Sequence, residues 1–218
     1  TLFRSGIVGA AIAYGLARAG EAVTLLDEGD VALRAARGNF GNVWVQGKGA
    51  TAPDYADLTR QAAADWGDFS AALQDETGID LHFRRPGAAY ICFSPEELGK
   101  RAATLAASNL KARLCSPFEV LDRAALAERL PAIGPDVAGA TYCPDDGTAN
   151  TLYLLRALIK AMVARGGRYL PRHAVTGLAR HGAGFSVETP QSRFSCGRIV
   201  LAAGLGNAAL APLLGLSG

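Results

Sequence analysis

The chain contains 218 residues, half of them hydrophobic, and has a formal net charge of +2. This composition excludes a disordered chain and allows a substantial core, in one large domain or two small ones. Because the chain has no dense run of Lys or Arg, its charge gives no argument for binding nucleic acid or an acidic membrane surface.

The cysteines and histidines predict neither disulfides nor a metal site. The four cysteines are widely separated without a C-x-x-C motif, and the three histidines lack the spacing of known metal-binding motifs. We therefore expect reduced, buried thiols, no bound metal and a cytoplasmic location. Residues 199–218 carry no charge, but their glycines and proline favour a buried strand, a loop and a short helix over a membrane span.

The strongest functional signal lies in residues 6–27, which are typical of a dinucleotide-binding β-α-β unit. Gly6 allows the backbone to approach a pyrophosphate, and Gly9 allows the helix to pack closely on the sheet. Gly20 can end this helix. The apolar strand that follows delivers Asp27 to a ribose hydroxyl, and an acid at that position disfavours a 2′-phosphate.

The start of this unit is incomplete. Arg4 stands where the first glycine of G-x-G-x-x-G belongs, and we expect residues 1–5 not to form the strand that should precede it. Because the only methionine is Met162, we expect a fragment whose first five residues come from a cloning or sequencing adaptor. A secretory signal peptide is the competing interpretation, since Arg4, an apolar stretch and an A-x-A motif at residues 17–19 imitate one.

Helices are predicted where apolar residues recur every three or four positions between end signals. Asp54 can cap a helix that ends before Gly78, and its predicted core stripe contains Tyr55, Leu58, Ala62, Trp66, Phe69 and Leu73. A capping box at residues 94–97 opens a helix to about Ser108, and a short helix follows at residues 122–130. Another helix begins at Asn150 or Thr151 and ends at Gly166, with a predicted buried face of Leu152, Leu155, Leu158, Ile159 and Met162.

Strands are predicted at short apolar and aromatic runs. We expect them at residues 82–84, 88–93, 118–121, 137–143, 168–170, 174–179, 185–188, 192–196 and 198–203. The last run is followed by Gly204. It suits a central parallel strand that is buried on both faces and has a ligand near its carboxyl end.

The order of these elements predicts an α/β fold in which a Rossmann-like domain is interrupted by an α+β substrate domain with a mostly antiparallel sheet. Residues 1–80 would form the first part of the nucleotide-binding domain, without its first strand. Residues 81–147 would belong to the substrate domain, and residues 148–218 would return to the nucleotide-binding domain. Substrate would bind where the two domains meet.

Five stretches together carry a family resemblance: residues 6–13, the strand ending in Asp27, residues 37–44, residues 146–150 and residues 201–204. They resemble FAD-dependent amine and amino-acid oxidoreductases of the D-amino-acid oxidase superfamily, near the glycine oxidases, opine oxidase subunits and hydrogen cyanide synthase subunits. The first stretch is shared by many flavoproteins, whereas the combination is more specific. The resemblance covers about residues 6–218.

The resemblance implies FAD as the cofactor. Gly6 and Gly9 would lie at its pyrophosphate, and Asp27 would hold the adenosine ribose. Val175 would meet the adenine through its backbone, and Ala203 and Gly204 would lie near the cofactor. The stretch from the pyrophosphate toward the isoalloxazine would comprise Ala36, Arg37, Gly38, Asn39 and Gly41. From the residues alone, this stretch is equally typical of a glycine-rich surface loop.

For the intact parent protein, the resemblance implies that an amine or α-amino acid gives a hydride to flavin N5, and that water hydrolyses the resulting imine. This reaction requires no acid-base triad, so no catalytic residue is assigned. His82, Arg84, Arg85 and Tyr90 could line the substrate side, although a strand edge with solvated charges is the favoured interpretation. Nothing matches the relatives' C-terminal glycine-rich stretch or substrate-binding arginine, so the chain resembles one truncated at both ends.

Two other functions stay open. The opening motif cannot separate FAD from NAD, so an NAD-linked dehydrogenase is an alternative, although the strand-rich middle favours FAD. A second alternative is a non-catalytic nucleotide-binding fragment or subunit, which is compatible with a partner subunit. The small-molecule partner would be an amine or amino acid.

Overall fold

The computed structural model describes residues 2–3, 6–29, 35–36 and 38–216. The chain divides into two compact units, each built from segments that are distant in sequence. The first unit contains Thr1–Asn39, Leu73–Leu81 and Thr151–Gly218, and the second contains Phe40–Ala72 and His82–Asn150. Residues 40–72 therefore group with the middle of the chain, whereas the sequence-based division places them with residues 1–80. The functional roles given to these segments stay a prediction.

A four-stranded parallel sheet lies in the first unit, with the strand order β12-β1-β2-β8. Its strands are β1 (Leu2–Phe3), β2 (Thr24–Leu26), β8 (Arg168–Leu170) and β12 (Val200–Leu201). The expectation that residues 1–5 cannot supply the first strand is wrong for Leu2 and Phe3. Backbone groups alone suffice for strand pairing, and β1 has a parallel neighbour on each side. β12 is parallel as predicted, but it lies at the edge of the described strands because β1 takes the inner place.

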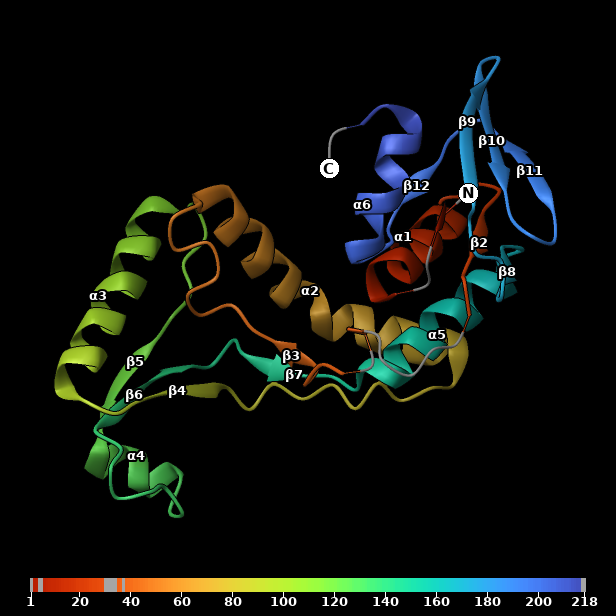
Figure 1. Cartoon of the computed structure of the whole chain (residues 1–218). Helices are drawn as coiled ribbons and strands as arrows, with labels where there is room; N and C mark the ends of the chain where they lie inside the picture. The colour runs from red at the N-terminus through yellow and green to blue at the C-terminus, as the bar shows by residue number, and fades with distance from the viewer. Residues whose placement is uncertain (1, 4–5, 30–34, 37, 217–218) are drawn as a thin grey trace. The chain divides into compact units, whose positions relative to one another are not determined.

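Two helices pack together in the first unit, α1 (Ile7–Arg18) and α5 (Thr151–Ala164) (Figure 1). The face that α1 buries consists of Gly9, Ala10, Ala13, Tyr14 and Ala17. α5 buries Leu154, Ala157, Leu158, Ala161 and Met162. The predicted face of α5 is thus right for Leu158 and Met162 and wrong for Leu152, which is exposed. The buried faces of both helices include small alanines, which permit close approach of neighbouring backbones.

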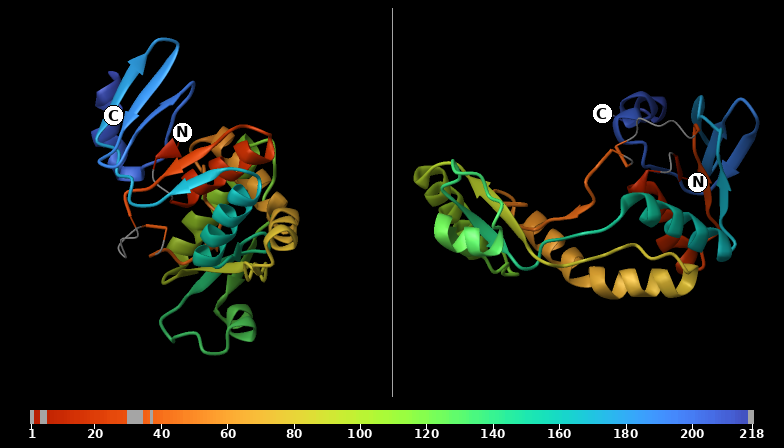
Figure 2. Two further views of the ribbon diagram at one scale, coloured as in Figure 1. Left: turned by 90° about the vertical axis from the view of Figure 1, so that its right-hand side faces the viewer. Right: turned by 90° about the horizontal axis from the view of Figure 1, so that it is seen from below.

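A three-stranded antiparallel sheet completes the first unit, with the order β11-β10-β9 (Figure 2). Its strands are β9 (Gly177–His181), β10 (Gly184–Glu188) and β11 (Arg193–Cys196). Leu178 and Val187 from this sheet pack with Leu26 of β2 in one apolar cluster. After β12, the chain continues through η1 (Gly204–Gly206), α6 (Asn207–Leu210) and η2 (Ala211–Leu214).

The second unit contains an antiparallel sheet with the order β4-β6-β5. Its elements are β4 (Ala88–Cys92), α3 (Pro95–Lys111), β5 (Glu119–Asp122), α4 (Arg123–Arg129) and β6 (Gly139–Cys143). Leu126 of α4 packs with Leu121 and Ala140 on one face of this sheet. α3 packs against β4 and β6 (Figure 1). The predicted α/β class, with a Rossmann-like parallel sheet and a separate antiparallel sheet, is confirmed.

A short antiparallel pair also lies in the second unit, formed by β3 (Asn42–Val43) and β7 (Gly147–Thr148). The strand predicted at residues 82–84 is wrong. Only Arg84 pairs, in a single bridge with Thr148, and His82 has a φ of 50°, which is incompatible with an extended strand.

The long helix α2 (Pro53–Thr77) ends before Gly78, as predicted, but its buried face differs from the predicted stripe. The buried residues are Ala56, Asp57, Arg60, Ala63, Ser70, Leu73 and Thr77. Tyr55 and Leu58 are 49% and 66% exposed. Polar side chains face inward here because they have partners: Arg60 Nη2 donates to Ser108 Oγ at 3.0 Å. Within the described residues, no helix combines the length and the apolar character needed to cross a bilayer.

Candidate nucleotide-binding site

The start of α1 is suited to bind an anion. Gly6 is its N-cap and has extended backbone angles. Because glycine has no side chain, the N–H groups of the first turn receive no cap from this residue, and the turn contains no acidic side chain. A Cβ added to Gly6 would meet no described atom within 4 Å. Among the residues that the structure describes, none crowds Gly6, and the N–H groups and dipole of a helix N-terminus favour negative charge.

Asp27 follows β2 directly and lies at the same edge of the sheet as the start of α1, because β1 and β2 are parallel neighbours. Its side chain is buried, and Oδ1 accepts the Gly29 N–H at 2.9 Å. The backbone of Asp27 is held as well: its N–H donates to the Leu170 carbonyl at 3.0 Å, and its carbonyl accepts the His173 N–H at 2.6 Å. The end of β8 and the loop after it are thus hydrogen-bonded to the residue that follows β2.

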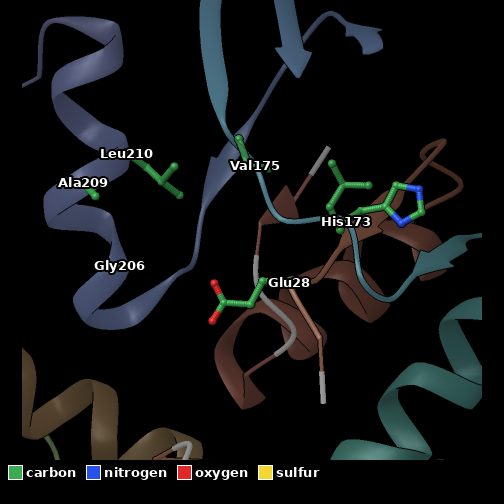
Figure 3. Close-up of a pocket in the computed structure, with 7 residues that line it drawn as sticks. Glu28, His173, Val175, Gly206, Ala209 and Leu210 are labelled. Atoms are coloured by element: carbon green, nitrogen blue, oxygen red, sulfur yellow. The ribbon is translucent and has the colours of Figure 1, made fainter. Parts of the chain in front are cut away.

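A cavity of about 230 Å³ opens at this edge of the sheet. Its walls come from three segments that follow β2, β8 and β12, and its lining residues are Leu26, Glu28, His173, Val175, Gly206, Ala209 and Leu210 (Figure 3). Figure 3 shows the Glu28 carboxylate turned toward α6. The cavity is smaller than the roughly 300–1,000 Å³ that holds a whole drug-sized ligand. It therefore suits one portion of a dinucleotide.

The charges at this edge differ between the end of β2 and the start of α1. Asp27 and Glu28 place two carboxyl groups after β2, where a phosphate would be repelled. The N-terminus of α1 offers N–H donors instead. Carboxyl oxygens accept hydrogen bonds from ribose hydroxyls or an amino group, so the cavity beside Glu28 suits a nucleoside and the helix start suits a diphosphate.

Asn207 shapes the wall formed after β12. Its Oδ1 accepts the Ala203 N–H at 2.9 Å, and its Nδ2 donates to the Leu201 carbonyl at 3.2 Å. Between these residues Gly204 has a φ of +56°, a conformation that glycine adopts without steric cost. This turn directs Gly206, Ala209 and Leu210 to the cavity.

The residues predicted to bind a cofactor are brought together in part. Gly6 and Gly9 lie in the cap and first turn of α1, Asp27 lies at the end of β2, and Val175 lines the cavity. Ala203 is buried beside the cavity wall, and its neighbour Gly204 is exposed at the start of η1.

The described residues of the predicted glycine-rich stretch do not line the cavity. Ala36 is half-buried and Gly38 is exposed. Asn39 is exposed, and its Nδ2 donates to the Ala35 and Ala36 carbonyls at 3.0 and 3.1 Å. Arg37 lies outside the described residues. Gly41 belongs to the second unit, has a φ of +72°, and accepts the Ala149 N–H at 2.8 Å.

Sequence reasoning missed Glu28, His173, Gly206, Ala209 and Leu210 as lining residues. Glu28 stands directly after the predicted acid and could have been found from that position. The three residues after β12 could have been found from the rule that a segment leaving the carboxyl end of a parallel strand faces the ligand. Nothing local to His173 signals its place, because the Asp27 carbonyl that holds it is far away in sequence.

The substrate-side candidates have structural partners in the second unit. Arg84 Nη1 donates to the Phe83 carbonyl at 2.9 Å, and Arg85 donates to the Ala63 carbonyl. The Tyr90 ring lies under the Arg101 guanidinium, 4.2 Å from its centre. Arg84, Arg85 and Tyr90 thus have contacts within the chain, and their place and that of His82 on the substrate side stay a prediction.

The cysteines are free thiols. Cys92 and Cys143 are buried, as predicted, and burial raises the pKa of both thiols. The prediction of burial is wrong for Cys115, which is exposed, and Cys196 is half-buried. Among the residues that the structure describes, no three His, Cys, Asp or Glu side chains lie together in a group that could hold a metal ion.

The chain is similar to several known proteins. An opine oxidase subunit from Rhizobium meliloti is 43% identical over the whole chain, which spans 59% of that relative. 4-Methylaminobutanoate oxidase (formaldehyde-forming) from Paenarthrobacter nicotinovorans is 31% identical over 97% of the chain and 25% of its own length. The crystal structure of glycine oxidase from Geobacillus kaustophilus has a TM-score of 0.86 at 24% identity, over 97% of this chain and 56% of that one.

The chain thus spans well under two thirds of the length of the relatives it matches. A family model described as FAD dependent oxidoreductase matches residues 5–217, almost the entire sequence. Because this match covers far more than half of the chain, the chain belongs to the family of FAD-dependent oxidoreductases.

Proposed function

We propose that this chain binds FAD in its first unit and forms part of an oxidoreductase that oxidises a C–N bond of an amine or amino acid. The observation that carries the proposal is the cavity at the carboxyl ends of β2, β8 and β12, at the sheet edge that also holds Asp27 and the start of α1. In parallel α/β sheets, nucleotides bind at this edge.

The residues at the proposed site fit the cofactor. The space beside Gly6 admits a diphosphate because no described atom would touch even an added Cβ there. Asp27 would accept a hydrogen bond from the ribose, and Glu28 would face the nucleoside from the cavity wall. Val175 and Leu210 would provide apolar contacts. Ala203, Gly204 and the stretch of Ala36, Arg37, Gly38, Asn39 and Gly41 stay predicted contacts.

When bound, FAD accepts a hydride from the carbon next to the substrate nitrogen. The task of this chain's residues is to hold and orient the cofactor. The N–H groups at the start of α1 would fix the diphosphate, and the carboxyl groups of Asp27 and Glu28 would fix the nucleoside at the other end of the same edge. Two anchoring points restrict both the position and the rotation of the bound molecule, which favours a reactive geometry.

The substrate and partner are proposed from the relatives. Their names, an opine oxidase subunit and 4-methylaminobutanoate oxidase, favour a substrate with an amine nitrogen. Because the first relative is named as one subunit of an oxidase, it also favours a second subunit as partner of the parent protein. A purely nucleotide-binding role is the second candidate, because the chain spans only 59% of that relative. A cytoplasmic location stays a prediction.

The test begins with the visible spectrum of the purified chain, after incubation with FAD and removal of free FAD. The sample is then mixed without oxygen with glycine, 4-methylaminobutanoate or an opine. We expect flavin absorption bands that are bleached by at least one of these compounds. Bands without bleaching would favour the nucleotide-binding role, and a colourless protein that binds NAD would contradict the proposal.

A further inference from the structure

A buried polar cluster lies in the second unit around Asp146, a residue to which the proposed function gives no role. Asp146 is fully buried. Its Oδ1 accepts the Val45 N–H at 2.6 Å and lies 3.4 Å from the Gln46 N–H. Its Oδ2 accepts Gln46 Nε2 at 2.8 Å. The Asp146 carboxylate thus accepts hydrogen bonds from the backbone N–H groups of Val45 and Gln46 and from the Gln46 side chain. These residues are 101 and 100 positions away in sequence.

Gln46 connects this carboxylate to the antiparallel sheet. Its side chain is buried, and its Nε2 also donates to the Ala88 carbonyl of β4 at 3.0 Å. Its Oε1 accepts the Thr141 hydroxyl of β6 at 2.9 Å. Arg101 Nη2 of α3 donates to the Gln46 carbonyl at 3.1 Å. Both polar ends of the Gln46 side chain therefore have partners, which fixes which end is the donor and which the acceptor.

Residues 146–149 lie beside residues 41–46 and are hydrogen-bonded to them at several points. The Ala149 N–H donates to the Gly41 carbonyl at 2.8 Å, and β7 pairs with β3 through Asn42 and Val43. Asp146 continues this pairing to Val45 and Gln46 through its side chain. The residue after Asp146 has to be a glycine, because a Cβ added to Gly147 would lie 2.4 Å from the Arg84 carbonyl oxygen.

The hydrogen bonds to Asp146 offset part of the cost of its burial. Removal from water raises the pKa of the carboxyl group above its usual value, and the charge of the neighbouring Asp145 acts in the same direction, whereas the Val45 and Gln46 donors act in the opposite direction. A buried carboxylate with incomplete hydrogen bonding would be costly. The three donors, all from residues 45 and 46, thus couple the burial of this side chain to one conformation of that segment.

We propose that Asp146 is a positioning residue that sets the backbone conformation of residues 41–46 and thereby the presentation of Gly41 to FAD. The second part rests on the proposed function, in which Gly41 is a predicted cofactor contact. The first part concerns only the second unit and stands on the hydrogen bonds to Val45, Gln46 and their neighbours.

The test compares the Asp146→Asn variant with Asp136→Asn, a control in which the same change is made at an exposed aspartate of the second unit. Asparagine keeps the shape of the side chain but turns an N–H donor toward one of the present donors. Amide hydrogen exchange is measured without FAD. We expect the Val45 and Gln46 amides to exchange about tenfold faster or more in Asp146→Asn, and at unchanged rates in Asp136→Asn.

A second variant keeps the test decisive if circular dichroism shows that Asp146→Asn does not fold. Thr141→Val removes one hydrogen bond to Gln46 and keeps the shape of the side chain, so we expect about threefold faster exchange at the same amides. The positioning role would be overturned by unchanged exchange at Val45 and Gln46 in a folded Asp146→Asn variant. If Asp146→Asn does not fold, unchanged exchange at these amides in Thr141→Val would overturn it.

The role toward FAD is read separately, from the FAD dissociation constant of each folded variant. We expect Asp146→Asn to raise it about threefold or more and Asp136→Asn to leave it unchanged. Faster exchange with an unaltered FAD affinity would overturn the link to Gly41. If the unaltered chain binds no FAD, the proposed function and this link both fail, whereas the exchange rates still decide whether Asp146 sets the segment.

Discussion

The carboxyl group of Asp57 joins the beginning of α2 to the segment after α3. It accepts the Leu114 N–H at 2.8 Å, the Arg113 N–H at 3.2 Å and Arg113 Nε at 3.1 Å. The Leu114 hydrogen bond is the largest cause that lowers the pKa of Asp57 below its usual value of 3.8, and the Arg113 contacts act in the same direction. The charged form is therefore favoured in the folded chain.

This lowered pKa predicts how stability depends on pH. Asp57 contributes stability at pH values above 3.8, the usual pKa, and this contribution is lost as the pH falls through the lower pKa of the folded state. We expect Asp57→Asn to unfold at a lower denaturant concentration than the unaltered chain at neutral pH. The difference should shrink as the pH falls below 3.8. Chemical denaturation followed by circular dichroism at several pH values measures both effects.

Asp68→Asn is the matched control, because Asp68 is an exposed residue of the same helix. Its denaturation midpoint should follow that of the unaltered chain at every pH. A constant difference between Asp57→Asn and the unaltered chain across the acid range would contradict the role given to the Asp57 charge.

At the scale of elements, the beginning of α3 shows the Ser94 cap of the predicted capping box, whereas Glu97 bonds the residue before the cap instead of the cap itself. The Ser94 hydroxyl accepts the Glu97 N–H at 3.1 Å, and Glu97 Oε2 accepts the Phe93 N–H at 2.8 Å. Pro95 occupies the first helical position, where its missing N–H has no consequence. The predicted cap is confirmed, because its hydrogen bonds join residues that are neighbours in sequence.

Replacing the cap should weaken the fold by a known amount. We expect Ser94→Ala to lower the free energy of unfolding by about 1 kcal/mol, since the first turn loses a side-chain acceptor. Glu96→Gln, in the same turn, removes only an exposed ion pair with Lys100 and should cost less than about 0.5 kcal/mol. Equal effects of the two substitutions in thermal or chemical unfolding would contradict the capping role of Ser94.

Sequence predicted the ends of helices better than their buried faces. Gly20 and Gly78 follow helix ends with positive φ, as expected for residues that stop a helix. By contrast, the buried face of α2 includes Asp57 and Arg60, whose partners Leu114 and Ser108 lie far away in sequence. An end signal is local, whereas a buried face depends on the tertiary neighbours of the helix.

The same distinction applies to the candidate site. Gly6 and Asp27 were predictable because glycine and acid occur at a fixed spacing around one helix and one strand. Val175 was proposed only through the family resemblance, and it lines the cavity. The segment of Gly206 and Leu210 could have been found because it leaves the carboxyl end of a parallel strand. Which of its residues line the cavity depends on the Asn207 turn, whose hydrogen bonds the sequence does not reveal.

At the scale of the whole molecule, the proposed cofactor site depends on chain segments from both ends of the sequence. The cavity takes Leu26 and Glu28 from the first part of the chain and five residues between positions 173 and 210 from the last part. β1 pairs with β2 and with β12, so it joins these parts in one sheet. We therefore infer that FAD binding requires the whole first unit, although each motif for it is short.

The most direct test of this account is the affinity of the chain for FAD after the Gly6→Ala substitution. Gly15→Ala is the matched control, because a Cβ added at either glycine meets no described atom within 4 Å and both glycines begin or lie in α1. The account predicts at least about a tenfold higher FAD dissociation constant for Gly6→Ala, whose methyl group would occupy the diphosphate space, and no change for Gly15→Ala. Equal FAD affinities of the folded Gly6→Ala variant and the unaltered chain would contradict it.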